Sequence, residues 1–164
     1  MKWKMITLLL SIVAIIALAY FIGLMLPKEQ VFVKEAILNS PTHEVFRLVT
    51  DVDSQTNWRA DVKEVKVIDD QTWTEVPQKG SPITFRTKQK IENQLFEIEI
   101  IEPKSFNGYW VGTFESIDNQ KTRVIFKEVI RIENPFFRLL SHIFVDLDKT
   151  MEDYMTNLKN QLDK

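Results

Sequence analysis

The chain has 164 residues, of which 45% are hydrophobic and 27% charged, and it contains eleven Phe, four Trp and three Tyr. This length and composition are typical of one globular domain with an appendage and exclude a disordered chain. The net charge of −2 gives no indication of nucleic-acid binding. The chain has no cysteine, which excludes disulfides, thiolate metal sites and a cysteine nucleophile.

The N-terminal run from Met5 to Leu26 has no charged residue. As a helix it would be about 33 Å long, close to the hydrocarbon thickness of a bilayer. Two main interpretations compete. Ala17-Leu18-Ala19 fits a signal-peptide cleavage site, but cleavage there would leave a second apolar run at the new N-terminus. We favour an uncleaved anchor over a cleaved signal peptide. A buried core helix fits least, because the run is apolar on all sides.

The charges that flank this run predict its orientation. Lys2 and Lys4 favour a cytoplasmic N-terminus, with the rest of the chain outside the cytoplasm, whereas Lys28 weakens the bias. We expect residues 1–30 to form a single-pass transmembrane signal-anchor with a short linker in the cell membrane, and residues 31–164 to form one domain. That domain has more acidic than basic residues, which argues against a polybasic contact with anionic lipid.

The sequence predicts that the domain begins with one strand, continues with a short helix, and then forms six more strands. Residues 31–38 are apolar and β-branched, and Ser40-Pro41 then predicts the start of a short helix, with a further turn before Trp58. Turn residues separate the later strands. Because their connections are short, these strands predict an antiparallel meander; they span residues 62–68, 72–76, 83–91, 95–101, 106–115 and 122–132.

Alternation along these strands predicts one apolar and one solvated face of the sheet. Phe96, Ile98 and Ile100 oppose Glu97 and Glu99, for example. Gly108 and Gly112 lie two residues either side of Trp110, and glycine inside a strand often marks a bend or bulge. We therefore expect a strongly curved sheet.

The last thirty residues predict a long helix that covers the apolar face. Asn134-Pro135 is a typical helix start. Apolar residues then recur at steps of three and four along one helix face, namely Phe137, Leu140, Phe144, Leu147, Met151, Tyr154, Leu158 and Leu162. A curved sheet wrapped on such a helix leaves room for a cavity between them. The apolar segment 136–145 could instead form a gate at the cavity entrance or simply pack under the loops, and we prefer the second interpretation.

The order of elements, with Pro41-Thr-His-Glu-Val45-Phe46, Thr50-Asp51 and Trp58 near its start, resembles the START-like superfamily, also called SRPBCC or helix-grip proteins. The resemblance is greatest to polyketide cyclase/dehydrase and lipid-transport-like bacterial members and covers Val31 to about Leu162. It implies an α+β fold: a seven-stranded curved antiparallel sheet (β-α-α-β6-α) wrapped on a long C-terminal helix, here preceded by one transmembrane helix.

The resemblance also implies a function. Members bind hydrophobic or amphipathic small molecules between sheet and helix; some carry lipids, and others are cyclases, dehydratases or hydrolases. The anchor departs from the usual soluble form and argues against a freely diffusing cytosolic cyclase.

Glu128 is the most suggestive single residue, since it is expected on the apolar face between Phe126 and Ile130. Burial disfavours the charged form of a carboxyl group, which suits an acid–base catalyst, but a polar anchor for a ligand or a paired strand-end Glu is the simpler interpretation. The candidate ligand-binding residues share the apolar sheet face or the facing side of the helix, although each aromatic one could be plain core; they are Phe85, Thr87, Gln89, Phe96, Ile98, Trp110, Phe114, Phe126, Glu128, Phe144, Leu147 and Met151.

We expect no metal and no cofactor. His142 and Asp146 could share a helix face, but two ligands do not make a metal site, and the phosphate-binding, dinucleotide-binding and hydrolase motifs are missing. Three hypotheses remain for the function: a membrane-anchored domain that binds a hydrophobic or lipid-like small molecule, a cyclase, dehydratase or hydrolase with Glu128 as acid or base, and an envelope interaction domain without a ligand.

Overall fold

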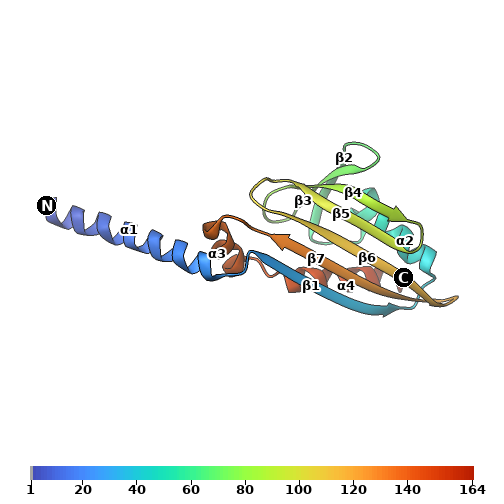
Figure 1. Cartoon of the computed structure of the whole chain (residues 1–164). Coiled ribbons are helices and arrows are strands. Elements are labelled where there is room, and N and C mark those ends of the chain that lie inside the picture. Colours follow the sequence, from blue (N-terminus) through green and yellow to red (C-terminus); the bar gives the residue numbers. More distant parts are fainter. Residues whose placement is uncertain (1) are drawn as a thin grey trace.

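The computed structural model describes residues 2–164 and places a long N-terminal helix beside one α+β domain (Figure 1). Seven strands form one sheet in the order β1-β7-β6-β5-β4-β3-β2. All neighbours are antiparallel, which confirms the predicted meander; the strands are β1 (Glu29–Leu38), β2 (Val62–Val67), β3 (Thr72–Pro77), β4 (Ile83–Ile91), β5 (Leu95–Glu102), β6 (Asn107–Asp118) and β7 (Lys121–Arg131). The first strand pairs with the last, so β1 forms one edge of the sheet and β2 the other.

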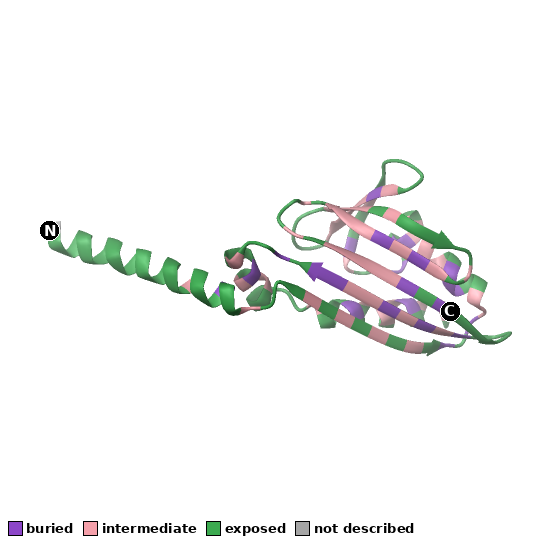
Figure 2. Ribbon diagram, viewed as in Figure 1, coloured by how far each residue is buried: buried purple, intermediate pink, exposed green. Residues whose placement is uncertain are grey.

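Helices cover one face of the curved sheet, as Figure 1 shows. They are α2 (Thr42–Thr50), the short 3₁₀ helix η1 (Asp53–Asn57) and the C-terminal α4 (Leu147–Leu162). Val45, Val49 and Leu158 are buried between these helices and the sheet, together with aromatic side chains from the central strands. The buried positions alternate along the strands in Figure 2, because successive side chains in a strand point to opposite faces. The predicted helix-grip arrangement is confirmed.

The predicted C-terminal helix is divided into two, α3 (Pro135–Phe144) and α4. Asn134 begins α3 as expected, since its side chain accepts hydrogen bonds from the backbone N–H of Phe136 and Phe137. Val145 is extended, and the Asp146 side chain then caps α4 by accepting from the backbone N–H of Lys149 at 3.0 Å. The division separates the apolar stripe: the α4 part faces the sheet, whereas Phe144 in α3 is 77% exposed.

A β-bulge changes which side chains of β4 face the helices. Thr87 pairs with Ile98, and Gln89 pairs with Glu97, the residue adjacent to Ile98 in β5. Lys88 between them has no paired residue in β5 and is the extra residue of the bulge. Gln89 therefore lies on the outer face and is exposed, which corrects its predicted position. Lys90 takes the inner face instead, and its Nζ lies 5.7 Å from the centre of the Phe46 ring.

The two glycines of β6 do not mark bulges, because the pairing of β6 with β7 stays in register through both. They are sites of close approach. A Cβ on Gly108 would lie 2.1 Å from the carbonyl oxygen of Val129, and one on Gly112 would lie 2.5 Å from the Trp110 ring. The missing side chain of Gly112 thus leaves the space in which the Trp110 indole lies flat along its own strand.

The N-terminal helix α1 (Lys2–Met25) is long and apolar enough to cross a membrane, a test that a signal sequence near the N-terminus also passes. It extends away from the domain, and its apolar side chains are exposed along almost its whole length (Figure 2). Its C-terminal end contacts α3.

Candidate ligand-binding site

A cavity of about 100 Å³ lies between the inner face of the sheet and the helices. Its apolar wall comes from β3 to β6, where the rings of Trp73 and Phe85 stack with their centres 5.8 Å apart. Met151 of α4 closes the opposite side, and the neighbouring Thr150 is exposed to solvent. The cavity therefore reaches the surface beside the first turns of α4.

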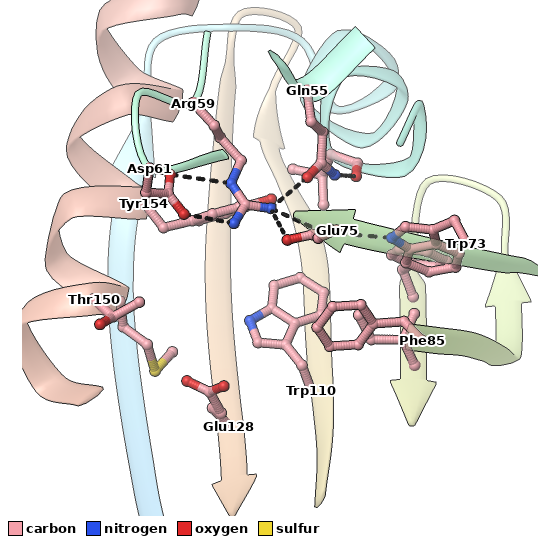
Figure 3. A pocket seen from close by; sticks show the side chains of 14 residues that line it. Gln55, Arg59, Asp61, Trp73, Glu75, Phe85, Trp110, Glu128, Thr150 and Tyr154 are labelled. Atoms are coloured by element: carbon pink, nitrogen blue, oxygen red, sulfur yellow. Dashed lines mark hydrogen bonds and ion pairs between the residues drawn. The ribbon is translucent and has the colours of Figure 1, made fainter. Parts of the chain in front are cut away.

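A network of polar side chains, centred on Arg59, occupies one end of the cavity (Figure 3). The guanidinium group of Arg59 donates to Gln55 Oε1 at 2.6 Å, to Glu75 at 3.0 Å and to Asp61 Oδ2 at 2.7 Å. The Gln55 side chain is itself held in place, because its Nε2 donates to the backbone oxygen of Val49. The Arg59 guanidinium also lies 5.2 Å from the centre of the Tyr154 ring. Gln55, Asp61 and Glu75 are thus joined through Arg59 into a polar cap at this end of the cavity.

Burial and neighbouring charges shift two pKa values in this network. Burial disfavours the charged form of Arg59, but the carboxylates of Glu75 and Asp61 more than offset this and raise its pKa above the usual range. Burial also raises the pKa of Tyr154, despite the opposing effect of Arg59. Both groups therefore keep their protons at all physiological pH values, so Arg59 stays a cation and Tyr154 a neutral donor.

Glu128 lies at the other end of the cavity and, unlike the polar groups around Arg59, has no bonded partner in the part of the chain that the structure describes. Its carboxylate forms no hydrogen bond or ion pair with any described residue, although it points into the cavity between Trp110 and α4 (Figure 3). Burial raises its pKa to about 7, and the charge of Glu75 adds to this shift while Arg59 opposes it. Figure 3 places the Trp110 indole nitrogen on the side of the ring that faces Glu128. Within the described part of the chain, this end of the cavity therefore holds an acceptor, the Glu128 carboxylate, and a donor, the Trp110 N–H, that both lack a protein hydrogen-bond partner.

The structure brings six predicted residues together on the cavity wall: Phe85, Phe96, Ile98, Trp110, Glu128 and Met151. Phe114 and Phe126 are fully buried in the core behind Trp110. Thr87 lines a second hollow near the β2–β3 turn. Gln89 is on the outer face, Phe144 is exposed on α3, and Leu147 is half-buried at the start of α4, outside the wall.

Sequence reasoning missed the whole polar cap. Arg59 and Asp61 lie in the loop after η1, where the sequence has neither helical nor strand periodicity. No pattern therefore indicates which way their side chains point. Glu75 did carry a signal: it lies two residues from Trp73, and residues two apart in a strand share a face. An inward Trp73 therefore implies an inward Glu75, and a buried carboxylate requires a cation such as Arg59.

The comparisons with known proteins agree with this architecture. A family model described as "Polyketide cyclase / dehydrase and lipid transport" matches residues 38–150, which is more than half of the chain. The chain belongs to the polyketide cyclase/dehydrase and lipid transport family. No match was found among curated proteins.

Solved structures of this cyclase/dehydrase and lipid transport fold resemble the chain over most of their length. A START superfamily protein from Mycobacterium smegmatis matches with a TM-score of 0.67 at 10% identity, covering 81% of this chain and 97% of that one. The ZhuI aromatase/cyclase from Streptomyces sp. R1128 matches with a TM-score of 0.68 at 9% identity, covering 82% and 94%. A protein from Thermus thermophilus reaches 17% identity with a TM-score of 0.65, covering 81% and 97%. At such identities these likenesses show the fold alone.

Proposed function

We propose that residues 31–164 form a binding domain for an amphipathic small molecule or lipid, which residues 1–30 anchor in the cell membrane. The observation that carries this proposal is the unpaired Glu128 carboxylate in an aromatic-walled cavity. Glu128 is half-buried, and a ligand that donates a hydrogen bond to its carboxylate would replace contacts with water that the cavity restricts. Membership of a lipid transport and cyclase family supports a ligand of this kind.

The size of the cavity limits what it could hold. Pockets for drug-sized ligands have volumes of roughly 300–1,000 Å³, whereas this cavity has about 100 Å³. A small polar head group with one ring or short chain would fit between Glu128 and the Trp110 ring. The rest of the ligand would extend through the open side near Thr150. A hydroxyl group suits this end best, since it both donates to a carboxylate and accepts from an indole N–H.

Native mass spectrometry of the full chain, purified in detergent, tests this proposal. We expect the wild-type protein to carry a bound small molecule and Glu128→Gln to lose most of it, because the amide cannot accept as a charged carboxylate does. Glu92→Gln, in the exposed β4–β5 turn, is the matched control and should keep full occupancy. An empty wild-type protein, or equal occupancy in both variants, would contradict the proposal.

A second candidate function is a cyclase, dehydratase or hydrolase reaction with Glu128 as acid or base. The specific observation in its favour is the pKa of about 7 for Glu128, because general acids and bases work best when their pKa lies near the working pH. Turnover of a co-purified ligand that stops in Glu128→Gln would support the enzyme over the binding module.

The orientation of the anchor is also part of the proposal: N-terminus in the cytoplasm and domain outside. Lys2 and Lys4 before the apolar run support it. A reporter enzyme that is active only outside the cytoplasm, fused after Lys164, should be active. The matched variant, Lys2→Glu with Lys4→Glu, should reduce this activity because it removes the positive charge from the N-terminal side. Activity of a cytoplasm-only reporter at the same position would overturn the orientation.

A further inference from the structure

Helix α3 exposes its apolar side and buries its cation, the reverse of what a water-exposed helix of a soluble domain does. Five apolar side chains are exposed and lie within an arc of about 120° at 3.6 residues per turn; they are Phe136, Phe137, Leu140, Ile143 and Phe144. Arg138 points the opposite way and is only 2% exposed. The exposed fractions of the five apolar side chains range from 36% for Leu140 to 77% for Phe144.

Arg138 fixes this orientation. Its guanidinium group donates to four backbone carbonyl oxygens: those of Gly23 and Leu26 at the end of α1, and those of Ile132 and Glu133 before α3. The carbonyls at the end of a helix have no partner within it, so Arg138 satisfies the last turn of α1 and joins it to the end of β7. The apolar face of α3 cannot turn inward without breaking these bonds.

The contact between α1 and α3 is also close. A Cβ on Gly23 would lie 2.0 Å from the carbonyl oxygen of Pro135, so the two helices touch at the level where α1 ends. Figure 1 shows α3 beside this end of α1, between the apolar helix and the sheet. The exposed apolar residues of α3 therefore lie beside the end of α1, at the point where a spanning helix would leave the bilayer.

From this geometry we infer that α3 is an interfacial membrane helix, which lies in the headgroup region with its apolar face in lipid. The inference rests on the proposed function in one respect, that α1 spans the membrane. The bilayer is the occupant that the structure favours over a protein partner, because α1 would hold α3 at the lipid surface continuously. A helix of this length binds lipid weakly by itself, but attachment to α1 makes its insertion an intramolecular step with a high effective concentration.

The consequence concerns the cavity. Leu147, Thr150 and Met151 follow α3 directly, and the open side of the cavity lies at Thr150. With α3 in the headgroup region, this opening lies next to the bilayer surface rather than in bulk water. An amphipathic ligand would then move between membrane and cavity over a short path along α3 and the first turns of α4.

Fluorescence quenching from within the bilayer tests this inference directly, since the chain has no cysteine and single cysteines can be labelled without background. Three exposed isoleucines serve as matched positions: Ile16 in α1, Ile143 in α3 (60% exposed) and Ile117 in β6 (49% exposed). Each full-chain variant, Ile16→Cys, Ile143→Cys or Ile117→Cys, is labelled with a fluorophore. It is then reconstituted in phosphatidylcholine vesicles that carry nitroxide groups on their acyl chains.

We expect strong quenching at Ile143 by nitroxides near the headgroups, strong quenching at Ile16 by nitroxides deep in the chains, and none at Ile117. Quenching at Ile16 with none at Ile143 would overturn the inference and leave the anchor intact. If iodide in the water also failed to quench that Ile143 label, the face would belong to a protein partner, which equally overturns it. Absence of quenching at Ile16 would contradict the anchor itself. Equal quenching at Ile143 and Ile117 would overturn the inference, because the contact would then be unspecific.

Discussion

Replacing Arg59 by Met is expected to lower the free energy of unfolding by about 3–5 kcal/mol, the usual cost of removing one partner from a buried ion pair. The side chains of Arg59 and Glu75 are 11% and 13% exposed, so water cannot solvate the Glu75 carboxylate once the guanidinium is gone. Gln55 Oε1 loses its donor as well. Urea denaturation of the full chain in detergent, followed by tryptophan fluorescence at neutral pH, measures the effect.

The matched control for this prediction is Arg86→Met. Arg86 pairs with Glu99 across β4 and β5, but on the solvated face, where its side chain is 52% exposed. Exposed ion pairs contribute about 0–1 kcal/mol, so this variant should unfold close to the wild-type denaturant concentration. A similar small loss in both variants would show that the Arg59 network is hydrated in solution and does not form a closed cap.

The stability of the protein is expected to fall as the pH rises from about 4.5 to 7, and Glu128 is the cause. Its pKa is raised from 4.5 to about 7 in the folded state. Between these values the folded state holds a proton that the unfolded state has lost, so stability decreases with pH in this window. The shift corresponds to about 3 kcal/mol, at 1.36 kcal/mol per pKa unit. This stability is fully present below pH 4.5 and lost above pH 7.

Glu128→Gln separates this effect from other titrations, because the neutral amide mimics the protonated acid at every pH. With both proteins free of ligand, the variant should be about 3 kcal/mol more stable than the wild type at pH 8, and the two should converge toward pH 4.5. Urea denaturation over this pH range measures the difference, with Glu92→Gln as the control that follows the wild type. A difference that does not change with pH would mean that Glu128 titrates normally and has water around it.

Period-two and period-3.6 patterns were sufficient to predict the seven strands and the apolar face of α4, but not that α3 is a separate helix with its apolar side exposed. These patterns depend only on the residues within a single strand or helix. The position of Gln89 was wrong because a bulge adds one residue to β4, and alternation read from one strand cannot detect an extra residue that only the pairing with β5 defines. The end of α3 did have a local signal, since Asp146 after the β-branched Val145 is a good helix start.

The candidate site was harder to predict than the sheet. Its aromatic wall follows from alternation, but its polar cap needs Arg59 from a loop, Glu75 from β3 and Gln55 from η1 to meet. That meeting depends on how the chain folds back between η1 and β3, and no repeat in the sequence encodes it. Arg138 was missed for a similar reason, because an arginine in an otherwise apolar helix is normally expected to face solvent. Its four carbonyl partners come from two distant parts of the chain.

The pairing of β1 with β7 has a consequence for how the protein is made. During synthesis β1 emerges directly after α1, but its only neighbour in the sheet is the last strand to appear. Pairing between strands so far apart in sequence is slow. Until it forms, both β1 and the free edge of β7 keep unpaired backbone groups, which favour contact with other chains. If α1 spans a membrane as proposed, copies in the same membrane would meet often at this stage. We expect exchange of the first strand between neighbouring molecules to be the main misfolding route of this protein.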